Sequence, residues 1–265
     1  MHSKSEGPPV TQRKHSALLR YIERLQGDTP WGSVLDAGTG VNSIRWIAGL
    51  DTARWTAVTG SAFEANQVRD ALGTIIRQQD RIVRGNWVDA KLLEGEVYDT
   101  VLADYLLGAV EGVAPHFQPY LFSRLRPMTG KTLYVTGLEP YVSTDRPETK
   151  AGRLLWDIGR FRDACVLLKG GMPYREYPSP WVLDHLKRAG FTTKAMKHFN
   201  IGYKDVFVSA QIKISLQGLD ALSDPALAKA LNDRGEALRA EADQVIKDEG
   251  ALRHCRSYVI AAEPN

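Results

Sequence analysis

Apolar residues follow two different spacings along this chain. Short uninterrupted runs, such as Val34-Leu35 and Val101-Leu102-Ala103, are typical of buried strands, whereas between residues 183 and 189 apolar side chains recur every three residues, as on one face of a helix. From residue 31 to residue 136 the two patterns alternate, which predicts a parallel sheet covered by helices. The predicted strands are 34–36, 55–59, 81–87, 98–104, 131–136, 191–198 and 256–262.

Seven strands with intervening helices predict an α/β fold: a Rossmann-like, doubly wound, mostly parallel seven-stranded sheet with helical insertions. The predicted helices are 13–25, 43–50, 64–76, 119–125, 153–168, 179–189 and 224–247, while 206–216 fits a helix or a strand. Ser179 is the predicted cap of the helix that Pro180 begins. We divide the chain into an N-terminal helical lid (1–30), a core (31–139), an inserted substrate cap (140–178) and the rest of the core sheet (179–265), with a helical insertion at about 203–250.

Composition narrows the class of protein. Lysine and arginine (34) exceed aspartate and glutamate (31) by only three, and these charges are interspersed, so a nucleic-acid partner is not favoured. The two cysteines, Cys165 and Cys255, form neither a disulfide framework nor a metal-binding quartet, and we predict no metal site. No stretch has the apolar length of a signal peptide or a membrane span, so we expect a cytoplasmic protein without a membrane partner.

The strongest chemical signal is Asp36-x-Gly38-x-Gly40, at the end of the first predicted strand. Glycines in a turn between a strand and a helix let the backbone approach a ligand closely. A carboxylate at this strand end suits a cationic or hydroxyl-rich ligand and repels a pyrophosphate. The pattern therefore predicts a nucleotide-type pocket and disfavours a dinucleotide.

The same stretch resembles motif I of the class I S-adenosylmethionine-dependent methyltransferases, acid-x-Gly-x-Gly-x-Gly, with Asn42 at the last glycine position. Asn tolerates unusual backbone angles better than most residues. The resemblance covers residues 31–136 and, through Leu183-x-x-Leu-x-x-Ala-Gly-Phe191, residues 179–199. It implies a methyltransferase whose cofactor, S-adenosyl-L-methionine, binds to the core.

This resemblance also implies which residues contact the cofactor. Asp36 would contact its amino group, Asn86 would meet the adenine, and Trp87 would either stack on the base or fill the core. The family usually has an acid for the ribose at the end of the second strand, where this chain has Thr59; Glu64, one helical step further, is the substitute. The implied cofactor-binding residues are Asp36, Gly38, Thr39, Gly40, Asn42, Thr59, Glu64, Asn86, Trp87, Asp104 and Tyr105.

The methyl acceptor is less well defined. The Asn/Asp-Pro-Pro-Tyr motif of many amino-methylating members is absent, which favours an oxygen acceptor on a small molecule. A carboxylate acceptor needs no base, whereas a hydroxyl does. His116 is the candidate base, and a surface or capping histidine is the alternative. The predicted acceptor-binding residues, aromatic side chains and one arginine for a carboxylate, are Tyr141, Trp156, Tyr174, Arg175 and Tyr177.

Three functions stay open on sequence alone. The first is an S-adenosylmethionine-dependent O-methyltransferase, with carboxyl methylation as one form. The second, a nicotinamide oxidoreductase, is disfavoured by Ser43 at the third glycine position and by the missing acid at Thr59. The third is a non-catalytic module that retains the pocket, suggested by Thr59 and Asn86. The helix after Asp224 either packs on the sheet or pairs with a second subunit in a homodimer.

Overall fold

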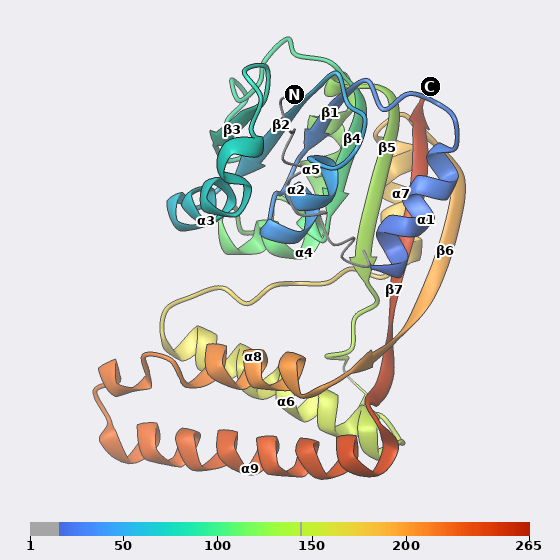
Figure 1. Ribbon diagram of the computed structural model, residues 1–265. Helices are drawn as coiled ribbons and strands as arrows, with labels where there is room; N and C mark the ends of the chain where they lie inside the picture. The colour runs from blue at the N-terminus through green and yellow to red at the C-terminus, as the bar shows by residue number, and fades with distance from the viewer. Residues whose placement is uncertain (1–15, 144) are drawn as a thin grey trace, which may run out of the picture.

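A single seven-stranded sheet organises the computed structural model, which describes residues 16–143 and 145–265. The strands are β1 (Ser33–Asp36), β2 (Arg54–Thr59), β3 (Arg81–Arg84), β4 (Tyr98–Asp104), β5 (Thr129–Leu138), β6 (Phe191–Tyr203) and β7 (Leu252–Pro264). Their order in the sheet is β3-β2-β1-β4-β5-β7-β6 (Figure 1). β7 runs antiparallel to its neighbours β5 and β6, and the remaining pairs are parallel. The predicted mostly parallel, doubly wound sheet is confirmed.

Helices cover both faces of this sheet. Because successive side chains of a strand point to opposite faces, Leu35 packs with the helices of one face and Val34 with those of the other. The first face carries α4, α5 and α7, and the second carries α1, α2 and α3. The helices are α1 (Ala17–Gln26), α2 (Val41–Ile47), α3 (Ala62–Leu72), α4 (Leu106–Ala109), α5 (Gln118–Leu125), α6 (Lys150–Leu168), α7 (Ser179–Arg188), α8 (Asp205–Leu216) and α9 (Pro225–Glu249).

The helices α6, α8 and α9 form a separate layer beyond the carboxyl end of β5 (Figure 1). We call these three helices the helical layer. Its own core includes Ile158 of α6, Ile212 of α8 and Leu238 of α9, together with Leu252 at the start of β7. The predicted cap at 140–178 and the predicted insertion at 203–250 thus pack against each other, and the ambiguous segment 206–216 is a helix.

Several predicted boundaries were wrong. The last two strands are longer than the predicted 191–198 and 256–262, because β6 and β7 continue into the helical layer, whereas β3 ends at Arg84. Ser179 is not the cap of α7: Pro178 occupies that position, and the Ser179 hydroxyl donates a hydrogen bond to Oε1 of Glu139 at 2.6 Å.

The N-terminal helix packs on the sheet. Leu19 and Ile22 of α1 are buried in the same cluster as Val259 of β7, and residues 1–15 of the predicted lid lie outside the described residues. In the part of the chain that the structure describes, no helix is both long and apolar enough to cross a membrane.

Candidate functional site

A cavity of about 800 Å³ opens at the carboxyl ends of β1, β2, β3 and β4. Crevices at this position are where open α/β sheets bind ligands. Its far wall comes from Val166 at the end of α6 and from Met172 and Tyr174, in the loop after that helix. Of the predicted site residues, those that line the cavity are Gly38, Thr39, Gly40, Asn42, Thr59, Glu64, Asn86, Trp87, Asp104, Tyr105 and Tyr174.

Asp36 lies behind this lining, fully buried beneath the glycine turn. Its Oδ2 accepts a hydrogen bond from the Ser43 hydroxyl at 2.8 Å, and its Oδ1 has no hydrogen-bond partner among the described residues. Burial raises the pKa of Asp36 to about 7, and the negative charge of Asp104 also raises it. The Ser43 hydrogen bond lowers it, as do the nearby Thr39 hydroxyl and Gly38 N–H, although neither of these two makes a hydrogen bond of good geometry to Oδ1. An unpartnered buried carboxyl oxygen calls for a functional explanation, and a cationic ligand group would supply its partner.

The two glycines of the turn meet different surroundings. A Cβ atom on Gly38 would lie 2.7 Å from Cδ1 of Leu106 in α4, so the turn packs against that helix. A Cβ atom on Gly40 would meet nothing within 4 Å, because Gly40 borders open space in the cavity. Gly38 is therefore needed for packing, whereas Gly40 leaves room for a ligand.

The ends of β2 and β3 place polar groups on the opposite side of the cavity. The Thr59 hydroxyl donates a hydrogen bond to Oε2 of Glu64 at 2.9 Å, which fixes a carboxylate beside the end of β2. Nδ2 of Asn86 donates to the carbonyl oxygen of Val113 at 2.7 Å. Hydroxyl-rich groups of a ligand would find acceptors here.

Trp87 belongs both to the core and to the cavity wall. It is 3% exposed, and its Nε1 donates a hydrogen bond to the carbonyl oxygen of Ala37 at 2.7 Å, which ties the segment after β3 to the end of β1. The core-filling alternative for this residue is thus supported, and the ring still borders the cavity.

At the end of β4, two neighbouring side chains border the centre of the site. The Thr136 hydroxyl donates to Oδ1 of Asp104 at 2.5 Å, and burial raises the pKa of this carboxyl. Tyr105 has a left-handed backbone with φ +49°, which is unusual for a residue with a side chain, and its hydroxyl lies 2.7 Å from the Ser257 hydroxyl. Burial raises the pKa of Tyr105 to about 12. Backbone strain of this kind is frequent at functional sites.

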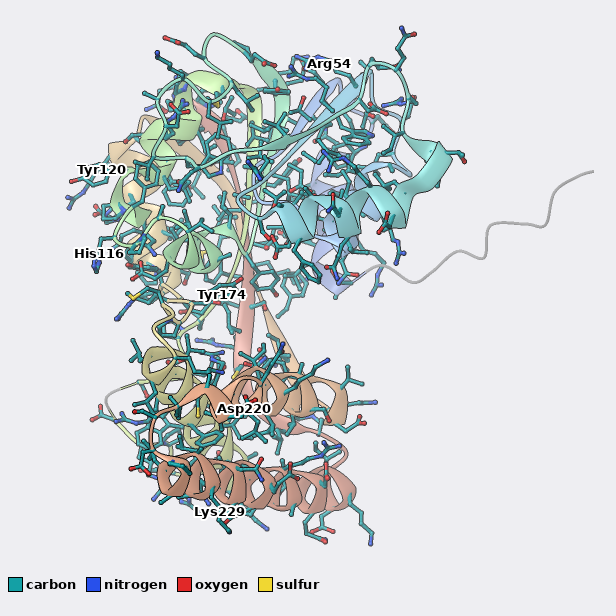
Figure 2. The ribbon with its side chains drawn as sticks, turned by 90° about the vertical axis from the view of Figure 1, so that its left-hand side faces the viewer. Arg54, His116, Tyr120, Tyr174, Asp220 and Lys229 are labelled. Carbon is teal, nitrogen blue, oxygen red and sulfur yellow. The ribbon has the colours of Figure 1, made fainter. Side chains whose placement is uncertain are left out.

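Two predicted residues with polar or charged side chains lie away from the cavity. His116 is exposed in a turn with φ +67°, where its backbone N–H donates to Oε2 of Glu111 at 2.9 Å, and Figure 2 shows it at the surface. Nε of Arg175 faces Oε1 of the same Glu111 at 3.4 Å. The structure therefore does not bring His116 or Arg175 to the cavity: Glu111 binds the backbone of the first and the side chain of the second.

The remaining predicted aromatics make packing contacts outside the cavity lining. Tyr141 is buried in the core of the helical layer, and its hydroxyl accepts a hydrogen bond from Nη1 of Arg162 at 3.1 Å. Nε1 of Trp156 donates to the carbonyl oxygen of Ser143 at 2.7 Å. The ring of Tyr177 lies 4.3 Å from that of Trp181.

Sequence analysis missed Glu176, in the loop between α6 and α7. It lies at no strand end and in no motif, so the sequence holds no signal for it. Burial raises the pKa of Glu176 to about 7, and the charge of Arg162 and a hydrogen bond from the backbone N–H of Leu138 lower it. Such a carboxyl beside a cavity is a candidate for proton transfer.

The charge of the cavity lining is one-sided. Among the described residues that line it, the ionisable carboxyls are Glu64 and Asp104, and none is a lysine, arginine or histidine. This arrangement suits a cationic or neutral ligand, whereas an anionic ligand would find no positively charged side chain in the described part of the lining. The described residues also contain no group of three or more histidine, cysteine, aspartate or glutamate side chains that could hold a metal ion.

Comparison with known proteins identifies the architecture. No protein-family model matches the chain, and no curated protein matches it by sequence. Solved structures do match: a proposed methyltransferase from Bacillus halodurans C-125 is 13% identical with a TM-score of 0.59, and the match covers 94% of this chain and 100% of that one.

Two further solved structures show how varied the proteins with this architecture are. The [4+2]-cyclase SpnF is 15% identical with a TM-score of 0.56, covering 93% of this chain and 80% of that one. The mycolic acid cyclopropane synthase CmaA1, complexed with SAH and CTAB, is 15% identical with a TM-score of 0.52. The match covers 91% of this chain and 83% of that one. At these identities the likeness shows the fold, and the reaction has to be argued from the site.

Proposed function

We propose that this chain, which has the fold of class I methyltransferases, is an S-adenosylmethionine-dependent methyltransferase that acts on a hydroxyl oxygen of a small molecule. The observation that carries the proposal is the unpartnered Oδ1 of Asp36, buried beneath a glycine turn at the edge of a cavity. S-adenosylmethionine has a cationic amino group and a cationic sulfonium. Either charge favours the ionised form of a nearby carboxyl.

The residues on the cavity wall fit the other parts of this cofactor. Gly40 leaves open space where a ligand approaches the backbone, and Glu64, held by Thr59, offers a carboxylate to ribose hydroxyls. Asn86 and Trp87 border the same side of the cavity, as adenine contacts would. The complex of CmaA1 with SAH, on the same fold, supports this choice of cofactor. When bound, S-adenosylmethionine supplies a methyl group bonded to a positively charged sulfur.

The lining favours a hydroxyl acceptor over a carboxylate. A carboxylate acceptor would need a cation, and the arginine predicted for it, Arg175, faces Glu111 instead. No lysine or arginine is found among the described residues of the lining. A neutral hydroxyl can hydrogen-bond to the carboxyls that are present.

The two alternative functions have less support. A nicotinamide cofactor carries a pyrophosphate, which the buried carboxyl of Asp36 disfavours. A non-catalytic module was suggested by the missing acid at Thr59, but Glu64 restores a carboxylate at that place.

Thermal denaturation with S-adenosylhomocysteine tests the proposal. A ligand at a hundredfold its dissociation constant adds about 2.7 kcal/mol to the free energy of unfolding. We expect a clear rise in the melting temperature with S-adenosylhomocysteine and none with NAD. A protein that responds to neither, or to NAD alone, would disprove the assignment.

A further inference from the structure

The loop between α6 and α7, residues 171–178, is fastened across the carboxyl end of the sheet. The backbone N–H of Arg175 donates a hydrogen bond to the carbonyl oxygen of Gly108 at 3.4 Å. The Tyr258 hydroxyl donates one to the backbone carbonyl oxygen of Tyr177 at 3.0 Å. Met172 and Tyr174 of the same loop line the cavity, and Figure 2 shows Tyr174 between the sheet and the helical layer. The loop therefore closes the side of the cavity next to β4 and β5.

Glu176, between these two anchors, points its carboxylate at α4 and β5. A Cβ atom on Gly108 would lie 2.8 Å from each of the two carboxylate oxygens, so the carboxylate packs directly against α4 at this glycine. The backbone N–H of Leu138 donates a hydrogen bond to the carboxylate. Ala109, the next residue of α4, lines the cavity. The carboxylate thus lies just behind the cavity wall, close enough to the lining residues Tyr105 and Tyr174 for its charge to raise their pKa values.

No side chain of the described residues forms a hydrogen bond or ion pair with this carboxylate. The cation that acts on it is Arg162, which is engaged elsewhere: its Nη2 lies 2.6 Å from Oδ1 of Asp163, and its Nη1 donates to Gln211 at 2.9 Å. Glu176 is half-buried, and a carboxyl in that position without a side-chain partner calls for a functional explanation.

The charge of Glu176 acts on several tyrosines. It contributes to the raised pKa of each of the tyrosines 105, 141, 174, 203 and 258. Tyr105 and Tyr174 line the cavity and are 37% and 53% exposed, so their rings are available to a ligand. Aromatic side chains and the thioether of Met172 suit an aromatic acceptor.

We propose that Glu176 is the catalytic base that accepts the proton of an aromatic hydroxyl, the methyl acceptor of this site. This inference rests on the proposed function and names its substrate class. As the acceptor oxygen forms its bond to the methyl carbon, the O–H proton passes to a carboxylate oxygen of Glu176. The carbon–sulfur bond breaks, and its electron pair stays on the sulfur of the departing S-adenosylhomocysteine.

The base has a suitable proton affinity for this task. A phenol has an ordinary pKa of about 10, so it is mostly protonated at neutral pH and benefits from a base. Burial puts the pKa of Glu176 at about 7, so a large share of the carboxyl is ionised at pH 7 to 8. General bases with a pKa near the working pH contribute about 10²–10⁴-fold to the rate.

The test compares Glu176→Gln and Glu176→Asp with the intact protein on a panel of phenols. The panel contains 4-methylphenol, catechol, 1-naphthol and 4-nitrophenol, and S-adenosylmethionine is saturating throughout. Glu236→Gln is the matched control, because it makes the same chemical change at an exposed position of α9. Binding of S-adenosylhomocysteine, measured by calorimetry, reports whether each variant keeps the cofactor half of the site.

We expect Glu176→Gln to lower kcat on 4-methylphenol by about 10²-fold or more while the affinity for S-adenosylhomocysteine is unchanged. The loss should be smaller with 4-nitrophenol, which is largely ionised at pH 8 without help. The wild-type rate should fall as the pH drops below about 7, and this dependence should disappear in Glu176→Gln. Glu176→Asp should restore part of the rate, since it keeps the carboxyl group.

Three results would overturn the assignment. An equal loss with both phenols would mean that Glu176 has only a structural role. A wild-type rate in Glu176→Gln would exclude the base. Binding of S-adenosylhomocysteine without methylation of any phenol would exclude the aromatic hydroxyl while methyl transfer stands. Failure of S-adenosylhomocysteine to bind the wild-type protein would instead remove the proposed function, and this inference with it.

Discussion

Asp36 is the residue on which the cofactor proposal depends most. Its ordinary pKa of 3.8 rises to about 7 on burial, so the folded protein holds this proton more tightly than the unfolded chain does. The stability that comes from the protonated form is fully present below pH 4 and is lost as the pH rises through about 7. A cationic ligand would favour the ionised form of this carboxyl instead of the protonated one. The cofactor should therefore bind more tightly as the pH rises from 6 to 8.

Replacing Asp36 by Asn should separate binding from stability. The amide cannot ionise, so the variant should lose less of its free energy of unfolding between pH 5 and pH 8 than the wild type. A charge-assisted hydrogen bond contributes about 1.5–3 kcal/mol, so the affinity for S-adenosylhomocysteine should fall roughly 10- to 150-fold. Calorimetry and denaturant titrations at both pH values measure the two effects. Unchanged affinity would show that Asp36 does not contact the ligand.

At this scale, most of the predicted residues that line the cavity are ones that a strand end and the turn after it place together. Asp36, Gly38 and Gly40 could be predicted because a short apolar strand leads directly into glycines. Glu176 could not, because its position depends on how the 171–178 loop is anchored to Gly108 and Tyr258, contacts between segments far apart in the sequence. His116 was misleading, because its distance along the chain from the end of β4 says nothing of the turn that exposes it.

Among the elements, the turn between β1 and α2 offers a matched pair of substitutions. Gly38→Ala forces a methyl group to within 2.7 Å of Leu106 and should cost about 1–3 kcal/mol of stability by overpacking. Gly40→Ala adds the same atom in open space, and the φ of Gly40, −131°, is available to alanine. It should leave the free energy of unfolding nearly unchanged but weaken S-adenosylhomocysteine binding, because the methyl group enters the cavity. Equal effects of the two substitutions on stability would contradict this view of the turn.

The elements also show where local patterns stop being informative. From Val208 to Leu216 apolar and polar residues alternate, which is typical of a strand, while the length of the segment 206–216 also fits a helix. Packing decides, because α8 contributes Val208 and Ile212 to a core shared with α6 and α9. Ser179 matches the pattern of a helix cap, yet a nearby acceptor, Glu139, takes its hydroxyl. In each case a contact between distant segments outweighs the local preference.

Considered whole, the molecule has two parts joined by two long strands. β6 and β7 belong to the sheet at one end and reach the helical layer at the other (Figure 1). The cavity draws on both parts: the glycine turn belongs to the sheet, while Val166 lies in the last turn of α6, in the helical layer. We infer that the cofactor half of the site depends on the sheet, and the acceptor half on the helical layer.

Two large-to-small substitutions in β7 test this division. Leu252 and Ile260 are both fully buried side chains of equal size, the first in the core of the helical layer and the second in that of the sheet. Each change to alanine should cost about 2–5 kcal/mol. In Leu252→Ala, hydrogen exchange should quicken first in α6, α8 and α9, and the affinity for S-adenosylhomocysteine should persist. In Ile260→Ala, exchange should quicken in β4 and β5, and that affinity should fall. If both variants lose affinity and protection alike, the two parts unfold as one unit and the division is wrong.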